Sequence, residues 1–438
     1  MTDVSAPVQS QPGALARPEP TRFYRWMVLF FISLTMFGNY YLYDSIAPVA
    51  DLLKSQLGYS DQMIGRLYSM YSYSAFALLL LGGIIIDKIG TKKAVMLFGS
   101  LCAVAGVLTA VSPNPHVMYA GRFILGFGAE SLIAAVTTAL AKWFKGKEIG
   151  LAFGINLTIA RLGSLGTDYS PTLFARWYHN WQDPLWIAAM IGSLCVGGGI
   201  VYWMLEASAE RKYVIGESGK TDKLVLKDLL TFDASFWYIT GLCLTFYAAV
   251  FPFRSFAIKF FQHGYGMSRS EAGRLNGFLP LAAMIATPIF GLLIDKVGKR
   301  ALFMAIGSLI IVPAYLLMMP SLHVTPYVSM TLIGIAFSLI PAVMWPSVAY
   351  LVNENRLGTA YALMALIQQL GVAAIEEGIG WSNDHFGASA ANPTGYDGML
   401  YLVSALGFLG LFFSFMLWKS ERGPRSHGLE TITAKTGA

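Results

Sequence analysis

Long apolar segments recur along the chain, and short polar segments that carry most of its charges separate them. A helix of about 20 apolar residues spans the hydrocarbon core of a bilayer and satisfies its backbone hydrogen bonds internally. The segments that reach this length are 25–50, 61–86, 93–112, 116–141, 148–175, 184–206, 235–261, 270–294, 300–320, 324–351, 357–380 and 397–418. The pattern predicts an all-α membrane protein with twelve transmembrane helices.

The composition agrees with a chain that is surrounded mostly by lipid. Apolar residues make up 55% of the 438 positions and charged residues 13%, whereas soluble domains contain about 25% charged residues. Cys102, Cys195 and Cys243 are scattered within apolar segments, so we interpret them as packing residues and expect neither a disulfide framework nor a metal site. No cofactor is expected.

The basic residues indicate which way the helices run. If the N-terminus lies in the cytoplasm, most Lys and Arg residues fall in cytoplasmic segments, as the positive-inside rule requires. The external segments then hold only Lys54, Arg66, Arg176, Lys259, Arg269 and Arg274. Both termini are therefore expected in the cytoplasm, and the net charge of +6 reflects this topology rather than nucleic-acid binding.

Two stretches of the sequence repeat at a spacing of 208 residues. GYSDQMIGRL from Gly58 matches GMSRSEAGRL from Gly266, and GIIIDKIGTKK from Gly83 matches GLLIDKVGKRA from Gly291. Repeats of like orientation are typical of transporters in which substrate binds near midmembrane, between two halves that rock about it. The sequence therefore predicts two pseudo-symmetric six-helix bundles.

The bundles and their connections divide the chain into five segments. The first residues are polar and proline-rich and lack the apolar core of a signal peptide, which predicts a disordered tail. The predicted segments are a cytoplasmic tail at 1–22, an N-terminal bundle at 23–206, a cytoplasmic linker at 207–234, a C-terminal bundle at 235–419 and a cytoplasmic C-terminal tail at 420–438.

Two charged residues lie near the middle of the predicted spans. Glu130 precedes the cytoplasmic Lys142 by 12 residues, and Arg161 follows Glu148 by 13 residues, so both lie about 18–20 Å deep. A charge at this depth is rarely tolerated facing lipid and marks a functional site. Either the two residues form a structural ion pair, or they face a water-filled cavity and bind opposite charges of one ligand. In the second case Glu130 receives an ammonium group and Arg161 a carboxylate.

Further charges lie near the predicted outer mouth. Asp44, Arg254 and Glu376 each stand about 28 Å from the cytoplasmic end of their spans, and Glu377 follows directly. As a hypothesis, Arg254 pairs with Asp44 or with Glu376 and Glu377 when the outer side is closed, and so forms a gate; Asp44 is also a candidate substrate-binding residue. The alternative is an arginine that snorkels to the interface beside ordinary interfacial acids.

The repeated G-x-x-x-D-K-x-G loop resembles the signature loop of the major facilitator superfamily. Its glycines permit a tight turn and its aspartate can meet a helix N-terminus, so a conformational role is expected; a plain positive-inside loop is the alternative. The residues concerned are Gly83, Asp87, Lys88 and Gly90 in the first copy and Asp295 and Lys296 in the second.

RFILGFGAES resembles the helix motif R-x-x-x-G-x-G of the same superfamily, which faces the central cavity. The resemblance implies that Arg122 lines this cavity and contributes to substrate binding. The alternative is that Arg122, close to the start of its span, snorkels to the outer interface.

The segment from Gly121 to Ser164 resembles the lysosomal dipeptide transporter branch of this superfamily. It contains GRFILGFGAESL, WFKGKEIGLAFG and ARLGS, and shorter matches such as WPSVAY from Trp345 occur in the second half. The resemblance implies that Glu130 and Arg161 bind the amino and carboxyl ends of a dipeptide, and that transport is uniport. It further implies a ligand contact for Trp345, for which simple packing is the alternative.

Together these patterns predict a secondary transporter of dipeptides or similar small zwitterions that works by rocking-bundle alternating access. No catalytic constellation or phosphate loop supports an enzyme. One alternative is a transporter of a small organic or inorganic anion, with or without proton coupling. The other is a receptor or subunit that transports nothing.

The expected location is a bacterial inner membrane. The N-terminal tail carries no acidic dileucine sorting signal, and the single permitted N-x-[ST] motif, at Asn156, lies within a predicted span where no glycan can be attached. The expected partners are a small-molecule substrate and the lipid bilayer, without nucleic acid, and nothing indicates an accessory subunit.

Overall fold

The computed structural model describes residues 18–144, 146–215, 232–353, 356–424 and 426–433, and within these residues it contains helices and no strands. Residues 1–17 of the predicted tail, 216–231 of the predicted linker and 434–438 of the predicted C-terminal tail lie outside the described residues. The helices are α1 (Arg22–Asp44), η1 (Ala47–Val49), α2 (Ala50–Leu57), α3 (Asp61–Ile89), α4 (Thr91–Val111), α5 (Pro115–Phe144), α6 (Ile149–Leu173), η2 (Ala175–Trp177), α7 (Gln182–Gly192), α8 (Leu194–Lys212), α9 (Ala234–Tyr265), α10 (Arg269–Asn276), α11 (Phe278–Val297), α12 (Arg300–Leu316), η4 (Pro320–Leu322), α13 (Pro326–Leu351), α14 (Leu357–His385), η6 (Pro393–Tyr396) and α15 (Asp397–Ser420).

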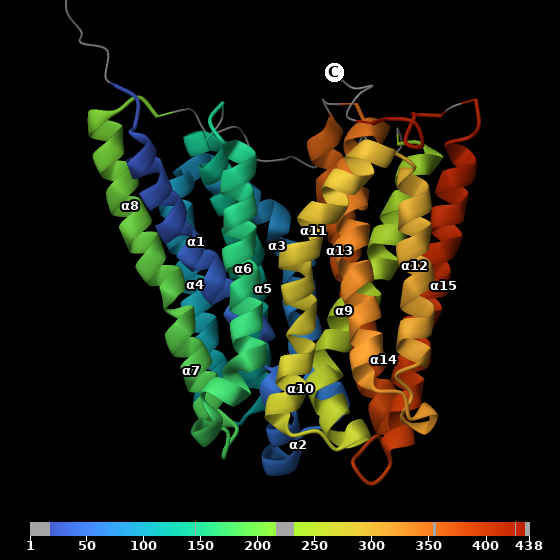
Figure 1. Ribbon diagram of the computed structural model, residues 1–438. Helices are drawn as coiled ribbons and strands as arrows, with labels where there is room; N and C mark the ends of the chain where they lie inside the picture. Colours follow the sequence, from blue (N-terminus) through green and yellow to red (C-terminus); the bar gives the residue numbers. More distant parts are fainter. Residues whose placement is uncertain (1–17, 145, 216–231, 354–355, 425, 434–438) are drawn as a thin grey trace, which may run out of the picture.

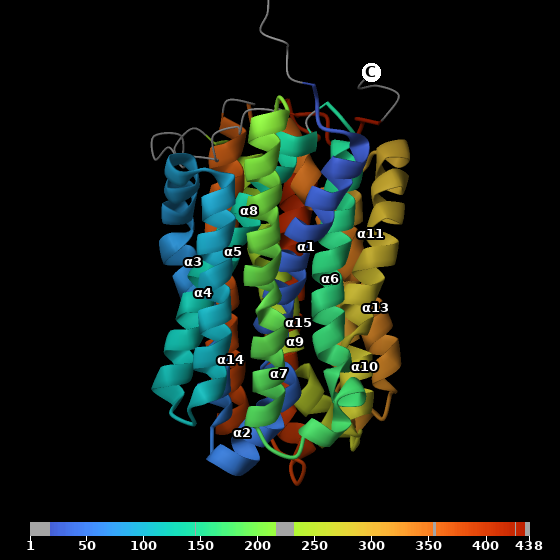
Figure 2. The same ribbon diagram turned by 90° about the vertical axis from the view of Figure 1, so that its left-hand side faces the viewer.

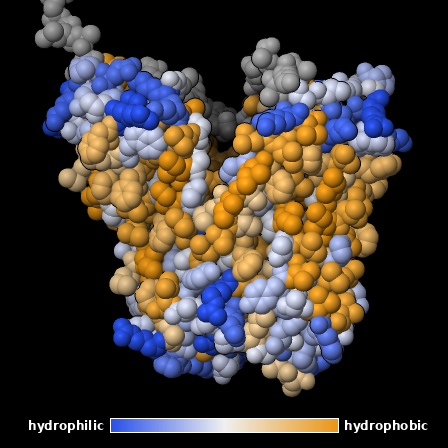
Figure 3. Space-filling model, viewed as in Figure 1, coloured by the Kyte–Doolittle hydropathy of each residue, from blue (hydrophilic) through white to orange (hydrophobic). Residues whose placement is uncertain are grey.

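The helices confirm the predicted all-α membrane fold. In the described part of the chain, 11 helical segments are long and apolar enough to cross a membrane, and α12, with 17 residues, completes the predicted set as a shorter apolar helix. Three predicted spans are interrupted: the first after Asp44, between α1 and η1, the sixth at Ser193 between α7 and α8, and the eighth at Gly277 between α10 and α11. Figure 3 shows an apolar belt between two polar rims, as expected for a protein that lipid surrounds.

Helices α1 to α8 form one bundle and α9 to α15 the other, and the two bundles stand side by side (Figures 1 and 2). The start of α1 and the end of α15 lie at the same face of the molecule, which we call the termini face; the opposite one is the distal face. The bundles diverge toward the termini face (Figure 1). They meet where α3 packs against α14 and where α6 packs against α10 and α11.

The two copies of the sequence repeat fold in the same way. Gly58 and Gly266 both have a positive φ, of 70° and 64°, which favours glycine. Ser60 then caps the N-terminus of α3 by accepting a hydrogen bond from the Met63 amide, and Ser268 caps α10 by accepting one from the Glu271 amide. Each copy therefore starts a helix of the distal face that packs against the other bundle.

Glycines bring the backbones of the two bundles into direct contact at this face. A Cβ atom at Gly65 in α3 would overlap the carbonyl oxygen of Glu376 in α14, and one at Gly273 in α10 would overlap the carbonyl oxygen of Asp168 in α6. Residues 65 and 273 are 208 apart, as are residues 168 and 376. The bundles thus close on each other through two pseudo-symmetric contacts.

We expect Gly65→Ala and Gly273→Ala each to weaken closure of the distal face by about 1–3 kcal/mol, because the added methyl group meets rigid backbone. Distances between spin labels across that face should lengthen. Gly154→Ala in α6 is the matched control, since a Cβ there meets nothing within 4 Å. Unchanged distances in both contact variants would show that closure of the distal face does not require glycine at these two positions.

Candidate functional site

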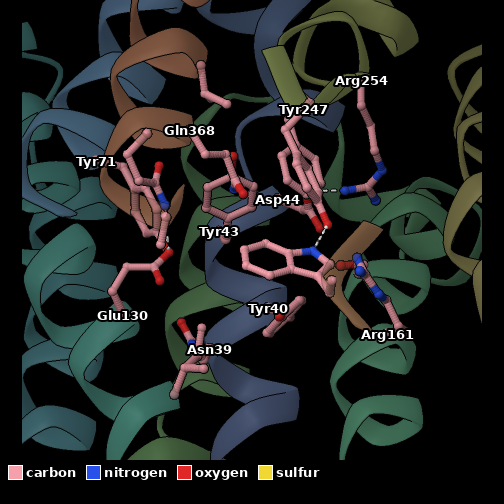
Figure 4. Close-up of a pocket in the computed structure, with 17 residues that line it drawn as sticks. Asn39, Tyr40, Tyr43, Asp44, Tyr71, Glu130, Arg161, Tyr247, Arg254 and Gln368 are labelled. Carbon is pink, nitrogen blue, oxygen red and sulfur yellow. Dashed lines mark hydrogen bonds and ion pairs between the residues drawn. The ribbon is translucent and has the colours of Figure 1, made fainter. Parts of the chain in front are cut away.

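A cavity of about 350 Å³ lies between the bundles, with walls from both of them (Figure 4). This volume is at the lower end of the range of pockets that hold small organic molecules. Its charged residues are Asp44, Glu130, Arg161 and Arg254, its aromatic residues are Tyr40, Tyr43, Tyr71, Tyr247, Phe251 and Trp345, and its amides are Asn39, Gln368 and Gln369. The cavity is therefore small, aromatic and charged at several separate points.

Glu130 of α5 lies at one side of the cavity and is held by neutral donors. The Tyr71 hydroxyl donates to its Oε1 atom at 2.8 Å, and the side-chain amide of Gln369 in the other bundle donates to the same atom at 3.1 Å. In the described part of the chain no cation forms an ion pair with it. The carboxylate is thus oriented but keeps capacity for a cationic ligand group.

Arg161 of α6 lies at the opposite side of the cavity from Glu130 (Figure 4). Its guanidinium lies over the Tyr40 ring at 5.8 Å and over the Phe337 ring at 5.2 Å, both to the ring centroid. Within the described residues it has no hydrogen bond and no carboxylate partner. Glu130 and Arg161 do not form the structural ion pair that was the alternative prediction, and a bidentate anion site is available at Arg161.

Trp345 of α13 lines the cavity between two tyrosines. Its Nε1 atom donates to the Tyr247 hydroxyl at 2.9 Å, and the Tyr361 hydroxyl donates to its carbonyl oxygen at 3.2 Å. Its ring lies 6.4 Å from that of Tyr247 and 5.9 Å from that of Tyr361. The second bundle therefore presents an ordered aromatic wall to the cavity.

Trp345→Phe should weaken ligand binding about two- to tenfold, since it keeps an aromatic ring but leaves the Tyr247 hydroxyl without its donor. Calorimetry on the purified variant measures this change. Trp237→Phe is the matched control because that side chain of α9 is 41% exposed and does not line the cavity. Equal affinities in the two variants would mean that Trp345 only packs.

Arg254 of α9 joins the bundles directly beside the cavity. Its guanidinium forms buried ion pairs with Asp44 of α1 and with Asp168 of α6, and Asn276 donates to the second carboxylate at 2.7 Å. Of the two pairings expected for Arg254, the one with Asp44 is present and the one with Glu376 and Glu377 is not. Sequence reasoning missed Asp168 and Asn276, although the repeat relates Asp168 to Glu376 and gave a signal for it.

Further ion pairs between the bundles lie beyond Arg254 toward the distal face. Lys259 of α9 is completely buried against Asp61 of α3, and Glu377 of α14 accepts from Arg66 at 3.2 Å and from Ser69 at 2.8 Å. Arg269 pairs with Asp51, and Asp384 accepts hydrogen bonds from the first amides of α3. Successive ion pairs and hydrogen bonds between the bundles therefore close the distal side of the cavity.

Arg122 is not at the cavity, contrary to the expectation from its motif, and it does not snorkel to the interface. It is fully buried in the N-terminal bundle, where its nitrogens donate to the carbonyl oxygens of Leu42, Tyr43 and Leu67 at 2.9–3.2 Å. All three guanidinium nitrogens thus bind backbone carbonyl oxygens, two at the end of α1 and one in α3. Arg122 braces the helices that carry Asp44 rather than presenting a charge to a ligand.

The signature loops also lie away from the cavity. Gly90 has a φ of 79°, which favours glycine at this turn between α3 and α4. Asp295 pairs with Arg300 at 3.3 Å within the C-terminal bundle. The other predicted residues of the two loops, which do not line the cavity, are Gly83, Asp87, Lys88 and Lys296.

Comparisons with known proteins agree with this architecture. The family model described as Major Facilitator Superfamily matches residues 29–375. The chain is 33% identical over 383 residues to the lysosomal dipeptide transporter MFSD1 of Homo sapiens, covering 83% of this chain and 81% of that protein. It is 22% identical over 288 residues to the probable sulfoacetate transporter SauU of Cupriavidus necator, covering 63% and 66% of the two chains.

A solved structure has the same fold. It is a bacterial homolog to the human lysosomal transporter Spinster in an inward-facing and occupied conformation, with a TM-score of 0.74 and 16% identity, covering 92% of this chain and 98% of that one. At this identity the likeness concerns the fold alone.

Proposed function

This chain belongs to the major facilitator superfamily, and we propose that it is a transporter whose substrates are dipeptides or similar small zwitterions. The single observation that carries the proposal is the separation of Glu130 and Arg161 on opposite sides of one cavity, each without an oppositely charged protein partner in the described part of the chain. A ligand with an ammonium group at one end and a carboxylate at the other neutralises both charges at once.

The proposal assigns a role to each part of the cavity. Glu130 binds the amino end, Arg161 binds the carboxyl end as a bidentate fork, and Trp345 and Tyr247 cover the middle of the ligand. Asp44 is committed to Arg254, so we place it in the gate rather than at the ligand. The similarity to the lysosomal dipeptide transporter MFSD1 supports the proposed class of substrate.

The conformation fits one stage of alternating access. The basic residues of the termini face suggest that this face is cytoplasmic, so the distal ion pairs form the external gate and the cavity opens toward the cytoplasm. Rocking of the bundles would break these pairs and open the other side. We propose uniport, in a bacterial inner membrane.

A small organic anion is the second candidate substrate, because Arg161 alone could bind a carboxylate or sulfonate and because SauU is named as a probable sulfoacetate transporter. Proteoliposomes that contain the purified protein separate the candidates when they are offered a panel of dipeptides and short anions with and without a pH gradient. Dipeptide uptake that equilibrates without the gradient supports the proposal. Uptake of anions alone would favour the second candidate. The absence of any uptake would favour a receptor that transports nothing.

A further inference from the structure

The pseudo-symmetry of the fold pairs Glu376 with Asp168, and the two acids differ in their surroundings. Both are completely buried at the points where the backbones of the bundles touch, Asp168 against Gly273 and Glu376 against Gly65. Asp168 is neutralised by the Arg254 guanidinium and receives a hydrogen bond from Asn276. The matching acid in α14 has no such partners.

At the positions 208 residues before Arg254 and Asn276 stand Ile46 and Tyr68, which supply no charge. The only hydrogen bond to Glu376 that the structure describes comes from the Ser72 hydroxyl, at 3.4 Å, and its Oε1 atom is buried without a partner. An ionised carboxylate in such a place costs several kcal/mol, whereas a neutral carboxylic acid costs far less.

The surrounding charges do not remove this cost. Arg122 of α5 acts on Glu376 through space, but its nitrogens are bound to backbone carbonyls. On α9, Arg254 and Lys259 are bound to other carboxylates. The remaining titratable neighbours are Tyr43 of α1, Tyr68 and Tyr73 of α3 and the adjacent Glu377, which is paired with Arg66.

The position of Glu376 decides which solution it can exchange a proton with. Val372, one helical turn before it, lines the cavity, and Glu376 lies beyond it toward the distal face. Closure of α3 on α14 buries the carboxyl group completely. Separation of these helices would hydrate it from the distal side.

We propose that Glu376 is a one-sided proton site: it holds a proton while the distal face is closed and releases that proton to the water on the distal side when the bundles separate there. The inference rests on the proposed alternating access, since it requires the distal face to open. A proton that binds and leaves on the same side performs no net transport, so the site regulates a uniporter without coupling it. Acid outside holds the gate closed, and a rise in external pH favours opening.

Spin labels at the exposed positions Ser55 and Ala391, one in each bundle at the distal face, measure this equilibrium in lipid nanodiscs. The ratio of open to closed protein should rise with pH by up to about tenfold per pH unit, as linkage to one proton requires. In Glu376→Gln, which stays neutral, the distances should not change with pH, whereas Glu376→Asp should restore the response. Glu377→Gln, the control, should shift the ratio but keep its pH dependence.

A pH response that persists in Glu376→Gln, or a wild-type protein whose distances do not change with pH, would overturn the inference. A thermal-shift assay measures dipeptide binding to Glu376→Gln. It shows that the variant is folded, and it tests the proposed function separately from the proton site. A wild-type protein that binds no dipeptide but keeps the pH-dependent distances would reject the proposed substrate and still support the proton site.

Discussion

Dipeptide uptake into proteoliposomes should fall about a hundredfold in Glu130→Gln and in Arg161→Ala, while both variants remain folded. Truncating one partner of a buried, hydrogen-bonded charge pair costs about 2–5 kcal/mol, because the opposite charge of the ligand enters the cavity unpaired. Glu130→Gln keeps the shape and the contacts with Tyr71 and Gln369 but removes the charge. Arg161→Lys should recover only part of the loss, since an ammonium group cannot form the bidentate fork.

Two variants of charged residues outside the cavity serve as controls. Glu210→Gln removes an exposed acid of α8, and Arg176→Ala removes an exposed base beside Trp177. Both should transport within about twofold of the wild type, since an exposed ion pair contributes about 0–1 kcal/mol and an exposed cation–π contact about 0.5–1 kcal/mol. Uptake within twofold of wild type in Glu130→Gln and Arg161→Ala as well would remove the proposed substrate site.

Arg254→Ala should have the largest effect on conformation. It leaves the carboxylates of Asp44 and Asp168 buried without their cation, and breaking such an arrangement costs about 3–5 kcal/mol. The distal face should then be open in most molecules. Reaction of a membrane-impermeant thiol reagent with a cysteine placed at the cavity, for example at Ser164, should become fast from the distal side.

The triple variant Arg254→Met, Asp44→Asn and Asp168→Asn tests the physical reason for this effect. It replaces the three charges by neutral groups of similar size, so closure should return toward that of the wild type. If Arg254→Ala stays closed to the reagent, Arg254 is no gate residue. If the triple variant is as open as the single one, the unpaired carboxylates are not the cause.

The membrane fold could be predicted from the sequence because the signals for it are either local in the sequence or occur twice in it. The length of the apolar segments located the spans, and the 208-residue repeat predicted two bundles. In the structure the two copies of the repeat start their helices in the same way, with the caps Ser60 and Ser268. The depth of Glu130 and Arg161 followed from the helical rise along one helix each. These features require no knowledge of how the bundles meet.

The contacts between the bundles could not be predicted in the same way. Gln369 reaches Glu130 across 239 positions of sequence, and Asp168 shares Arg254 with Asp44 because helices of both bundles converge at that point. Arg122 is a different case: its motif predicted a place at the cavity, whereas the carbonyl oxygens of Leu42 and Tyr43 at the end of α1 bind it inside the bundle. Whether such a side chain faces the cavity, the other bundle or the inside of its own bundle depends on how its helix is rotated about its axis. The length of an apolar span does not determine this rotation.

Calorimetry with end-capped dipeptides tests the central claim most directly. A dipeptide, its N-acetyl form and its C-terminal amide are each titrated into wild type, Glu130→Gln and Arg161→Ala. We predict that acetylation weakens binding to wild type by at least about tenfold but hardly affects Glu130→Gln, and that amidation does the same for Arg161→Ala, since each cap then removes a charge whose partner is already gone. Equal penalties for each cap in all three proteins would contradict the claim that Glu130 and Arg161 hold the two ends of one zwitterion.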